Sequence, residues 1–202
     1  MAIRAGASAL GLVSAMPSGP GVIDEATIAA VAAAVPPSVA TFLLTSLQDT
    51  ATIAEQQRRL RTTTVQICDR VARGTHAGLR QALPGIGLVQ VVHVTGPESV
   101  EEAVRVAPEV DALLLDSGNL SLTVKELGGT GRRHDWSLSR HIREEVRVPV
   151  FLAGGLGPAS VREAIAEVGA FGLDICSGVR TDGRLDPGKL EAFFAPIRTT
   201  RA

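Results

Sequence analysis

Seven short apolar runs recur along the chain, and a stretch with the composition of a helix separates each run from the next. The runs are Ala9–Ser14, Val39–Thr45, Thr64–Cys68, Leu88–Val94, Ala112–Asp116, Val148–Ala153 and Phe171–Ser177. Each is rich in Val, Leu or Ile and too short for a helix, so we expect buried strands. Their apolarity is nearly continuous, which is typical of parallel strands covered on both faces.

Helices are predicted between these strands. They cover Ala26–Val35, Asp49–Arg61, Ala77–Leu83, Glu98–Ala107, Ser137–Val146, Ala159–Val168 and Leu190–Ile197. Asp24 and Asp135 stand where N-terminal caps are expected. Strand and helix therefore alternate along the chain, which predicts βαβ units and a parallel sheet with right-handed crossovers.

Two architectures fit this alternation, a doubly wound open sheet and a (β/α)8 barrel of TIM type. No Gly-x-Gly-x-x-Gly motif follows the first strand, so the dinucleotide-binding open sheet lacks its fingerprint. Polar and Gly-rich segments directly follow strands at Asp116-Ser117-Gly118, Gly154-Gly155 and Ser177-Gly178. A barrel places its chemistry at that end of its strands. We therefore predict one α/β domain, a TIM-type barrel over residues 1–202.

The start of the chain is similar to a later segment. Residues 4–12 (RAGASALGL) and 167–173 (EVGAFGL) both have the pattern of a helix end, a Gly cap and a strand. We therefore expect the chain to begin inside a helix, so that the barrel lacks its first β-strand. An unclosed barrel exposes two strand edges, which favours a homo-oligomer.

The composition of the chain limits which binding partners and which cellular compartment we expect. Lys and Arg number 20 and Asp and Glu number 21, so no large basic face for nucleic acid is expected. Aromatic residues are 3% of the chain and Tyr is absent, which argues against a base-stacking surface. No run approaches the ~20 apolar residues that span a membrane. Two distant Cys fit a reducing compartment, so we predict a cytoplasmic protein.

The ends of three strands supply the first candidate site residues. Asp116 ends an apolar strand and should face the mouth of the barrel, where it either caps the next loop or acts as a general acid or base. The Gly154-Gly155 and Ser177-Gly178 turns follow the last two strands, where barrels bind phosphate through backbone N–H groups. Simple tight turning is the alternative interpretation of both turns.

The segment 117–134 is long for the connection between a strand and a helix, so we interpret it as a lid or binding loop rather than a plain connector. Arg132 and Arg133 lie in it and could contact substrate anions. His93 ends a strand and could reach the site, and His134 lies in the Gly-rich segment. His76 and His141 are expected on helix surfaces. No two His have metal-ligand spacing, so no metal site is predicted.

Four motifs, taken together and in order, resemble the phosphoribosylanthranilate isomerase family of tryptophan biosynthesis. They are Leu115-Asp116-Ser117-Gly118, Gly128-Gly129-Thr130-Gly131-x-x-x-Asp135-Trp136, Pro149-Val150-Phe151-Leu152-Ala153-Gly154-Gly155-Leu156 and Asp174-x-x-Ser177-Gly178-Val179. The resemblance covers residues 88 to 194 well. The first half matches more loosely.

The resemblance implies a (β/α)8 barrel without a cofactor that catalyses an Amadori rearrangement of a phosphorylated aminosugar. It implies that Asp116 is the general acid and that Asp174 lies at the floor of the site. Gly154, Gly155, Ser177 and Gly178 would cradle the substrate phosphate.

The sequence departs from the family pattern in three places. The family base is a Cys on the first strand, which this sequence lacks. The loop Met16-Pro17-Ser18-Gly19-Pro20-Gly21 has no cation where the family has an Arg for the anthranilate carboxylate. The fourth-strand motif reads Gln66-Ile67-Cys68-Asp69 instead of Gln-Leu-His-Gly. Cys68 either replaces the missing base or is a small buried residue, as free Cys usually is.

Two other functions stay open at this point. One is a non-catalytic phosphosugar-binding homologue, which the missing Cys and Arg favour. The other is an isomerase of a different phosphorylated sugar that keeps the phosphate cradle without the carboxylate clamp.

Overall fold

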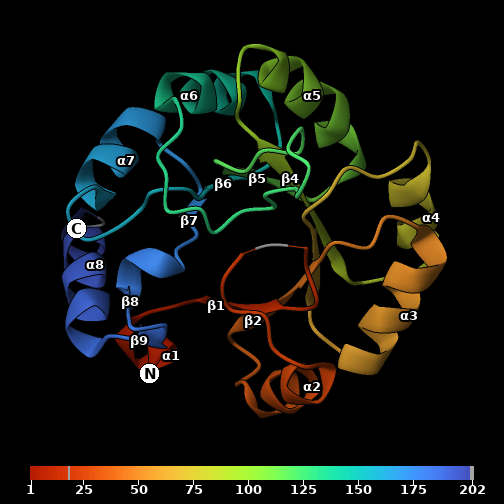
Figure 1. The fold of residues 1–202 in the computed structure, drawn as a ribbon, viewed down its shortest axis with the longest axis horizontal. Coiled ribbons are helices and arrows are strands. Elements are labelled where there is room, and N and C mark those ends of the chain that lie inside the picture. Colours follow the sequence, from red (N-terminus) through yellow and green to blue (C-terminus); the bar gives the residue numbers. More distant parts are fainter. Residues whose placement is uncertain (18, 201–202) are drawn as a thin grey trace.

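The protein is described here by a computed structural model covering residues 1–17 and 19–200, so Ser18 of the predicted loop 16–21 lies outside the described residues. Seven strands form one parallel sheet in chain order, and Figure 1 shows that this sheet is curled. The strands are β1 (Ala9–Val13), β2 (Ala40–Thr45), β3 (Thr64–Ile67), β4 (Gly87–His93), β5 (Ala112–Asp116), β6 (Val150–Leu152) and β7 (Gly172–Leu173). Its edges, β1 and β7, are not paired with each other in the described part of the chain. The predicted TIM-type barrel short of one strand is therefore confirmed.

Helices connect the strands and lie on the outer side of the curled sheet (Figure 1). They are α2 (Glu25–Ala34), α3 (Thr50–Leu60), α4 (Thr75–Ala82), α5 (Glu98–Val106), α6 (Trp136–Glu145), α7 (Val161–Val168) and α8 (Pro187–Thr200), with short 3-10 turns η1 (Ala107–Glu109) and η2 (Ser177–Val179). A small hairpin, β8 (Arg180–Thr181) and β9 (Arg184–Leu185), precedes α8. Among the described residues, every helix is too short or too polar to span a lipid bilayer.

The predicted caps are present. The Asp24 carboxylate accepts a hydrogen bond from the Thr27 backbone N–H at 2.8 Å, and Asp135 accepts one from that of Ser137 at 2.9 Å. The expected first helix is also confirmed as α1 (Ala2–Ala5), which ends at Gly6 with φ 119°, a left-handed conformation that glycine adopts at little cost.

Two layers of apolar side chains fill the structure, one on each face of the sheet. Leu113 and Leu115 pack toward the helices, in a cluster that contains Trp136. Ala112 and Leu114 belong to a second cluster, inside the curl. Because side chains alternate along a strand, this register turns the last residue of β5 toward the inside as well.

Two expectations for buried and exposed residues were wrong. Phe171 is 67% exposed and packs edge-on against Phe151, because β7 is an edge strand with no neighbour on its other side. His76 is buried rather than on a helix surface. Its Nδ1 lies 3.1 Å from Glu109 Oε2 and its Nε2 lies 2.9 Å from Gln90 Oε1, so these polar partners satisfy both ring nitrogens. His141 is exposed as expected.

Candidate active site

Asp116 is the last residue of β5 and is buried at the carboxyl end of the sheet. Its Oδ1 accepts a hydrogen bond from the Ser117 backbone N–H at 2.7 Å. Its Oδ2 faces Gly128, where a Cβ would overlap the oxygen. Gly128 has φ 123°, so both the space and the backbone conformation at this position require glycine. Segment 117–134 therefore approaches Oδ2 of Asp116 at Gly128, while Oδ1 lies next to Gly154.

Two adjoining hollows open beside Asp116. The first, of about 330 Å³, is lined mainly by the backbone-rich segments Ala153–Leu156 and Asp174–Ser177. The second, of about 490 Å³, is lined largely by apolar residues: Val13, Met16, Pro20, Leu44, Val91 and Leu127. Asp116 and Asp174 line both hollows. The two carboxylates therefore lie at the junction between a glycine-rich hollow and an apolar one.

The glycine-rich hollow is lined by three of the four residues predicted to cradle a phosphate. Gly154 and Gly155 line it with φ 78° and 67°, and Ser177 lines it from the opposite loop. Gly178 is not among the lining residues. A Cβ on Gly178 would overlap the carbonyl oxygen of Leu156, so this glycine lets the two loops approach each other behind the hollow.

Asp174 has an altered proton affinity. The pKa of Asp174 is raised to about 6, because burial and the negative charge of Asp116 together outweigh the lowering effect of a hydrogen bond from the Ile175 backbone. A carboxyl group with such a pKa exchanges its proton near neutral pH, which is a property of acid–base catalysts.

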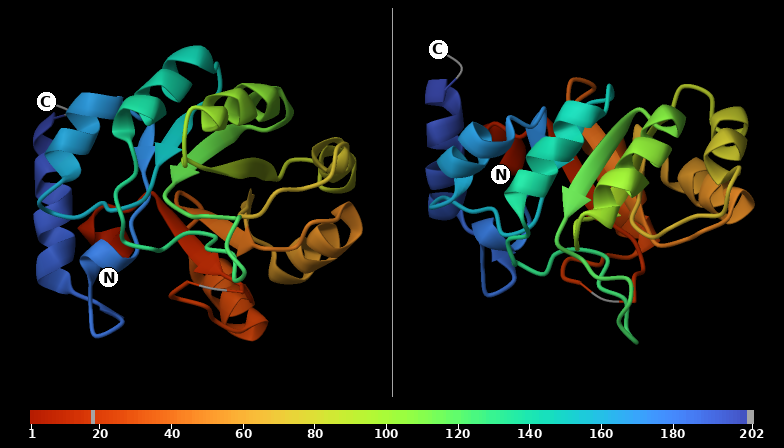
Figure 2. Two further views of the ribbon diagram at one scale, coloured as in Figure 1. Left: turned by 45° about the horizontal axis from the view of Figure 1, so that its top comes forward. Right: turned by 90° about the horizontal axis from the view of Figure 1, so that it is seen from above.

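The segment 117–134 lies over the carboxyl end of the sheet, on the same side as the loop that follows β1 (Figure 2). Asn119 and Glu126 pair through two backbone hydrogen bonds. The Lys125 ammonium binds the buried Asp69 carboxylate at 2.6 Å, and the Ser117 and Thr130 hydroxyls lie 2.6 Å apart. The first and third contacts lie within the segment, and the Lys125–Asp69 pair joins it to the residues after β3. Its role as a lid or binding loop stays a prediction.

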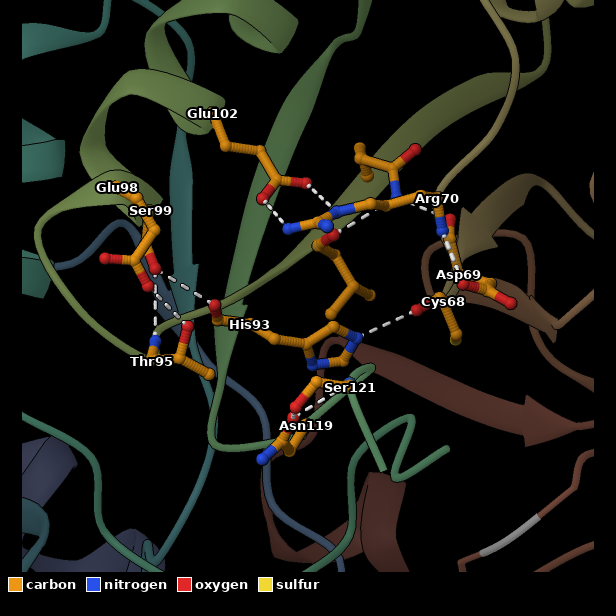
Figure 3. Close-up of polar contacts among 12 residues, drawn as sticks. Cys68, Asp69, Arg70, His93, Thr95, Glu98, Ser99, Glu102, Asn119 and Ser121 are labelled. Atoms are coloured by element: carbon orange, nitrogen blue, oxygen red, sulfur yellow. Dashed lines mark hydrogen bonds and ion pairs between the residues drawn. The ribbon is translucent and has the colours of Figure 1, made fainter. Parts of the chain in front are cut away.

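Cys68 and His93 form a separate contact beneath this segment (Figure 3). His93 Nε2 lies 3.0 Å from the Cys68 carbonyl oxygen and must donate, because a carbonyl only accepts. The Cys68 side chain is 1% exposed, packs in the inner apolar cluster and lines neither hollow. Burial and the nearby charge of Asp116 raise the pKa of its thiol.

The arginines of the lid segment bind protein groups. Arg132 pairs with Glu126. The Arg133 guanidinium lies 3.6 Å from the Trp136 ring centroid and pairs with Glu163 at 2.8 Å. Neither arginine lines a hollow, and their expected contact with substrate anions stays a prediction.

The position of His134 relative to Asp116 was not predictable from local sequence. The chain path brings His134 Nδ1 to the same face of Gly154 as the Asp116 carboxylate. The only local signal was its position directly before the capping residue Asp135, which fixes where α6 begins but not what the imidazole meets. No group of three or more His, Cys, Asp or Glu side chains in residues 1–17 and 19–200 is arranged to hold a metal ion.

A curled parallel sheet with two carboxylates between a glycine-rich and an apolar hollow defines a (β/α)-barrel of the kind that binds phosphorylated small molecules. The chain matches a family model described as N-(5'phosphoribosyl)anthranilate (PRA) isomerase over residues 2–196, and it belongs to this family.

Individual proteins support the assignment. The chain is 30% identical to N-(5'-phosphoribosyl)anthranilate isomerase of Methanocella arvoryzae, an alignment that covers 97% of this chain and 90% of the relative. It is 35% identical to N-(5'-phosphoribosyl)anthranilate isomerase 2 of Methanosarcina mazei, over 96% and 85% of the two chains. The crystal structure of phosphoribosyl anthranilate isomerase from Thermotoga maritima superimposes with a TM-score of 0.80 at 25% identity, over 98% of this chain and 91% of that one.

Proposed function

We propose that this chain catalyses the reaction of its family, the isomerisation of N-(5'-phosphoribosyl)anthranilate in tryptophan biosynthesis. The observation that carries the proposal is the position of Asp116 between the two hollows. The substrate is a small molecule with a phosphate at one end, an aromatic ring at the other and the reacting carbons between them. A phosphate in the glycine-rich hollow and a ring in the apolar hollow place those carbons beside Asp116.

The rearrangement needs one acid and one base. Asp116, as the acid, protonates the sugar ring oxygen, and the bond from this oxygen to C1 breaks to leave an iminium ion. The base then removes the C2 proton, and the electron pair of that C–H bond moves to form the enolamine. Tautomerisation gives the ketone, so C2 is oxidised while C1 is reduced and no external oxidant is consumed.

The phosphate is held by groups at the carboxyl ends of β6 and β7. Backbone N–H groups near Gly154, Gly155 and Ser177 bind the anion, and Gly178 allows their two loops to meet. In this proposal the cradle supplies binding energy that orients the sugar, while the carboxylates carry the proton transfers.

Two side chains are candidates for the base. Asp174 is favoured, since it lines both hollows and has a pKa raised to about 6. The role proposed for Cys68 requires a thiolate, and burial opposes formation of that thiolate. Replacement of Cys68, described in the Discussion, decides between them.

One observation favours the alternative of a differently specific phosphosugar isomerase. None of the described residues lining the apolar hollow is a Lys or an Arg, so no cation there would pair with the anthranilate carboxylate. Under this alternative, ribulose 5-phosphate would bind as tightly as the anthranilate adduct.

The test is turnover of N-(5'-phosphoribosyl)anthranilate by the purified 202-residue protein, followed through the loss of anthranilate fluorescence. Turnover that requires Asp116 supports the proposal. Failure to turn over this compound, combined with tight binding and conversion of ribulose 5-phosphate, replaces the proposal with the alternative. Binding without conversion of either compound favours a non-catalytic homologue.

Four further expectations remain proposals: a single domain over residues 1–202, a cytoplasmic location, a homo-oligomer and no nucleic-acid partner. Sedimentation of the purified chain measures its oligomeric state directly.

A further inference from the structure

Three polar atoms meet on one side of Gly154. His134 Nδ1, Asp116 Oδ1 and Ser117 Oγ lie 3.1, 3.0 and 3.0 Å from the position that a Cβ on Gly154 would take. These atoms come from the end of the lid segment and from the end of β5, segments that the tertiary fold brings together. A side chain at position 154 would crowd all three, so glycine leaves them room to approach one another.

The other ring nitrogen of His134, Nε2, is hydrogen-bonded to a serine of α6. Nε2 lies 2.6 Å from the Ser139 hydroxyl, and Ser139 is fully buried in α6. Nδ1 is itself buried and has no hydrogen-bond partner among the described residues. A buried polar atom without a partner is costly, and such atoms are concentrated where function requires them.

The Ser139 contact leaves the position of the imidazole proton free to change. A hydroxyl can either donate or accept, so it can support the ring proton on Nε2 or on Nδ1. When the ring proton is on Nδ1, an N–H group lies on the Asp116 side of the ring, which suits an ionised carboxylate. When the proton is on Nε2, the Nδ1 lone pair lies on that side, which suits a protonated carboxyl group. A general acid passes through both states in every turnover.

We propose that His134 is a positioning residue for Asp116, which alternates between its two neutral tautomers as Asp116 loses and regains its proton. This inference rests on the proposed function, because it assigns the partner of the proposed acid.

The charges around the ring are compatible with this role. The pKa of His134 is lowered to about 4, because burial, with a smaller contribution from Arg133, outweighs the opposing charges of Asp116 and Asp135. The ring is therefore neutral at neutral pH, where either tautomer is accessible. The carboxyl group of Asp174 and the thiol of Cys68 are further titratable groups that feel the charge of Asp116.

The decisive comparison uses three variants at this position. His134→Asn keeps a polar atom near the place of Nδ1, His134→Gln keeps one near that of Nε2, and His134→Phe keeps only the ring. We expect kcat to fall about tenfold in the Phe and Gln variants, with KM within twofold, an altered acid limb of the pH–rate profile, and recovery of most of the rate in the Asn variant. Equal losses in all three variants, or losses with a wild-type pH profile, would mean that the ring is only structural and would overturn the inference.

A second measurement separates this inference from the proposed function. Nitrogen NMR of the His134 ring reports its tautomer and titration without any turnover. We expect Asp116→Asn to change the tautomer balance and to lower the titration midpoint, because Asp116 raises the pKa of His134. A spectrum unchanged by Asp116→Asn overturns the inference even if the enzyme is active. If Asp116→Asn changes the His134 spectrum but the wild-type protein does not turn over the substrate, the proposed function is wrong and the coupling between His134 and Asp116 still holds.

Discussion

Asp116 and Asp174 line the same two hollows from opposite sides of β6, and the charge of Asp116 helps to raise the pKa of Asp174 to about 6. Two carboxyl groups that share a partly buried site separate in proton affinity, because the second negative charge is unfavourable beside the first. The raised pKa of Asp174 therefore lets this carboxyl group keep its proton to a higher pH than an ordinary Asp does.

Asp174 should make the protein less stable as pH rises. Its pKa is above the ordinary value of 3.8, so between about pH 4 and pH 6 the folded chain binds more protons than the unfolded chain, and the free energy of unfolding falls with rising pH. We expect Asp174→Asn to raise the free energy of unfolding by about 1–3 kcal/mol at pH 7, with little difference at pH 4, while turnover falls. Urea denaturation at both pH values measures this. Asp182→Asn, in the exposed β8–β9 turn, is the matched control, and a stabilisation by Asp174→Asn that does not depend on pH would contradict the prediction.

Loss of the Asp116 carboxylate should abolish the reaction without unfolding the barrel. We expect Asp116→Asn to lower kcat at least ~100-fold, since an amide cannot protonate the ring oxygen. Asp111 directly precedes the same strand at its other end and binds Arg80, so Asp111→Asn is the control. It should retain kcat within about twofold despite a modest loss of stability. The fluorescence assay and circular dichroism of both variants check this, and an active Asp116→Asn protein would remove Asp116 from the mechanism.

Gly178 should control phosphate binding from behind the cradle. A methyl group there overlaps the Leu156 carbonyl oxygen, so Gly178→Ala must separate the two loops. We expect KM to rise about tenfold or more, with weaker inhibition by inorganic phosphate. Gly157→Ala in the first of those loops is the control, because a methyl group there meets nothing within 4 Å. Similar KM values for the two variants would show that the close approach of the loops does not matter for binding.

The Lys125–Asp69 ion pair should hold the lid segment in place. Asp69 is buried, so Lys125→Met removes a cation that balances the negative charge of its carboxylate. We expect KM to rise several-fold and proteolytic cleavage within residues 117–134 to accelerate. Arg140→Met removes an exposed ion pair with Glu144 on α6 and should change neither quantity. Unchanged cleavage in Lys125→Met would mean that the other contacts of the segment suffice.

The variants Cys68→Ser and Cys68→Ala test whether Cys68 is the catalytic base. The thiol is buried in the inner apolar cluster and burial raises its pKa, so we expect kcat to stay within about threefold in both variants. The Ser variant should lose more stability, because it buries a hydroxyl among apolar groups. A loss of kcat of ~100-fold or more in both would instead identify Cys68 as the base.

Local pattern was enough to predict most elements. Asp24 and Asp135 were predicted as caps because a capping carboxylate interacts with backbone only two or three residues away. The segment Phe171–Ser177 shows where local pattern fails. Only Gly172–Leu173 is a strand, and Phe171 is exposed, because the pattern of a strand does not say whether another strand lies on each side of it.

The sequence by itself determined the order of strands and helices, the cap positions and, through motif resemblance, the residues at the ends of β5, β6 and β7. These follow from interactions within a few residues, or from short motifs. Only the tertiary structure decided that His76 is buried against Gln90, that Cys68 lies outside both hollows, and that His134 Nδ1 and the Asp116 carboxylate lie on the same side of Gly154. These placements depend on how the helices pack on the sheet and on how the sheet curls, which together bring side chains that lie far apart along the chain next to one another.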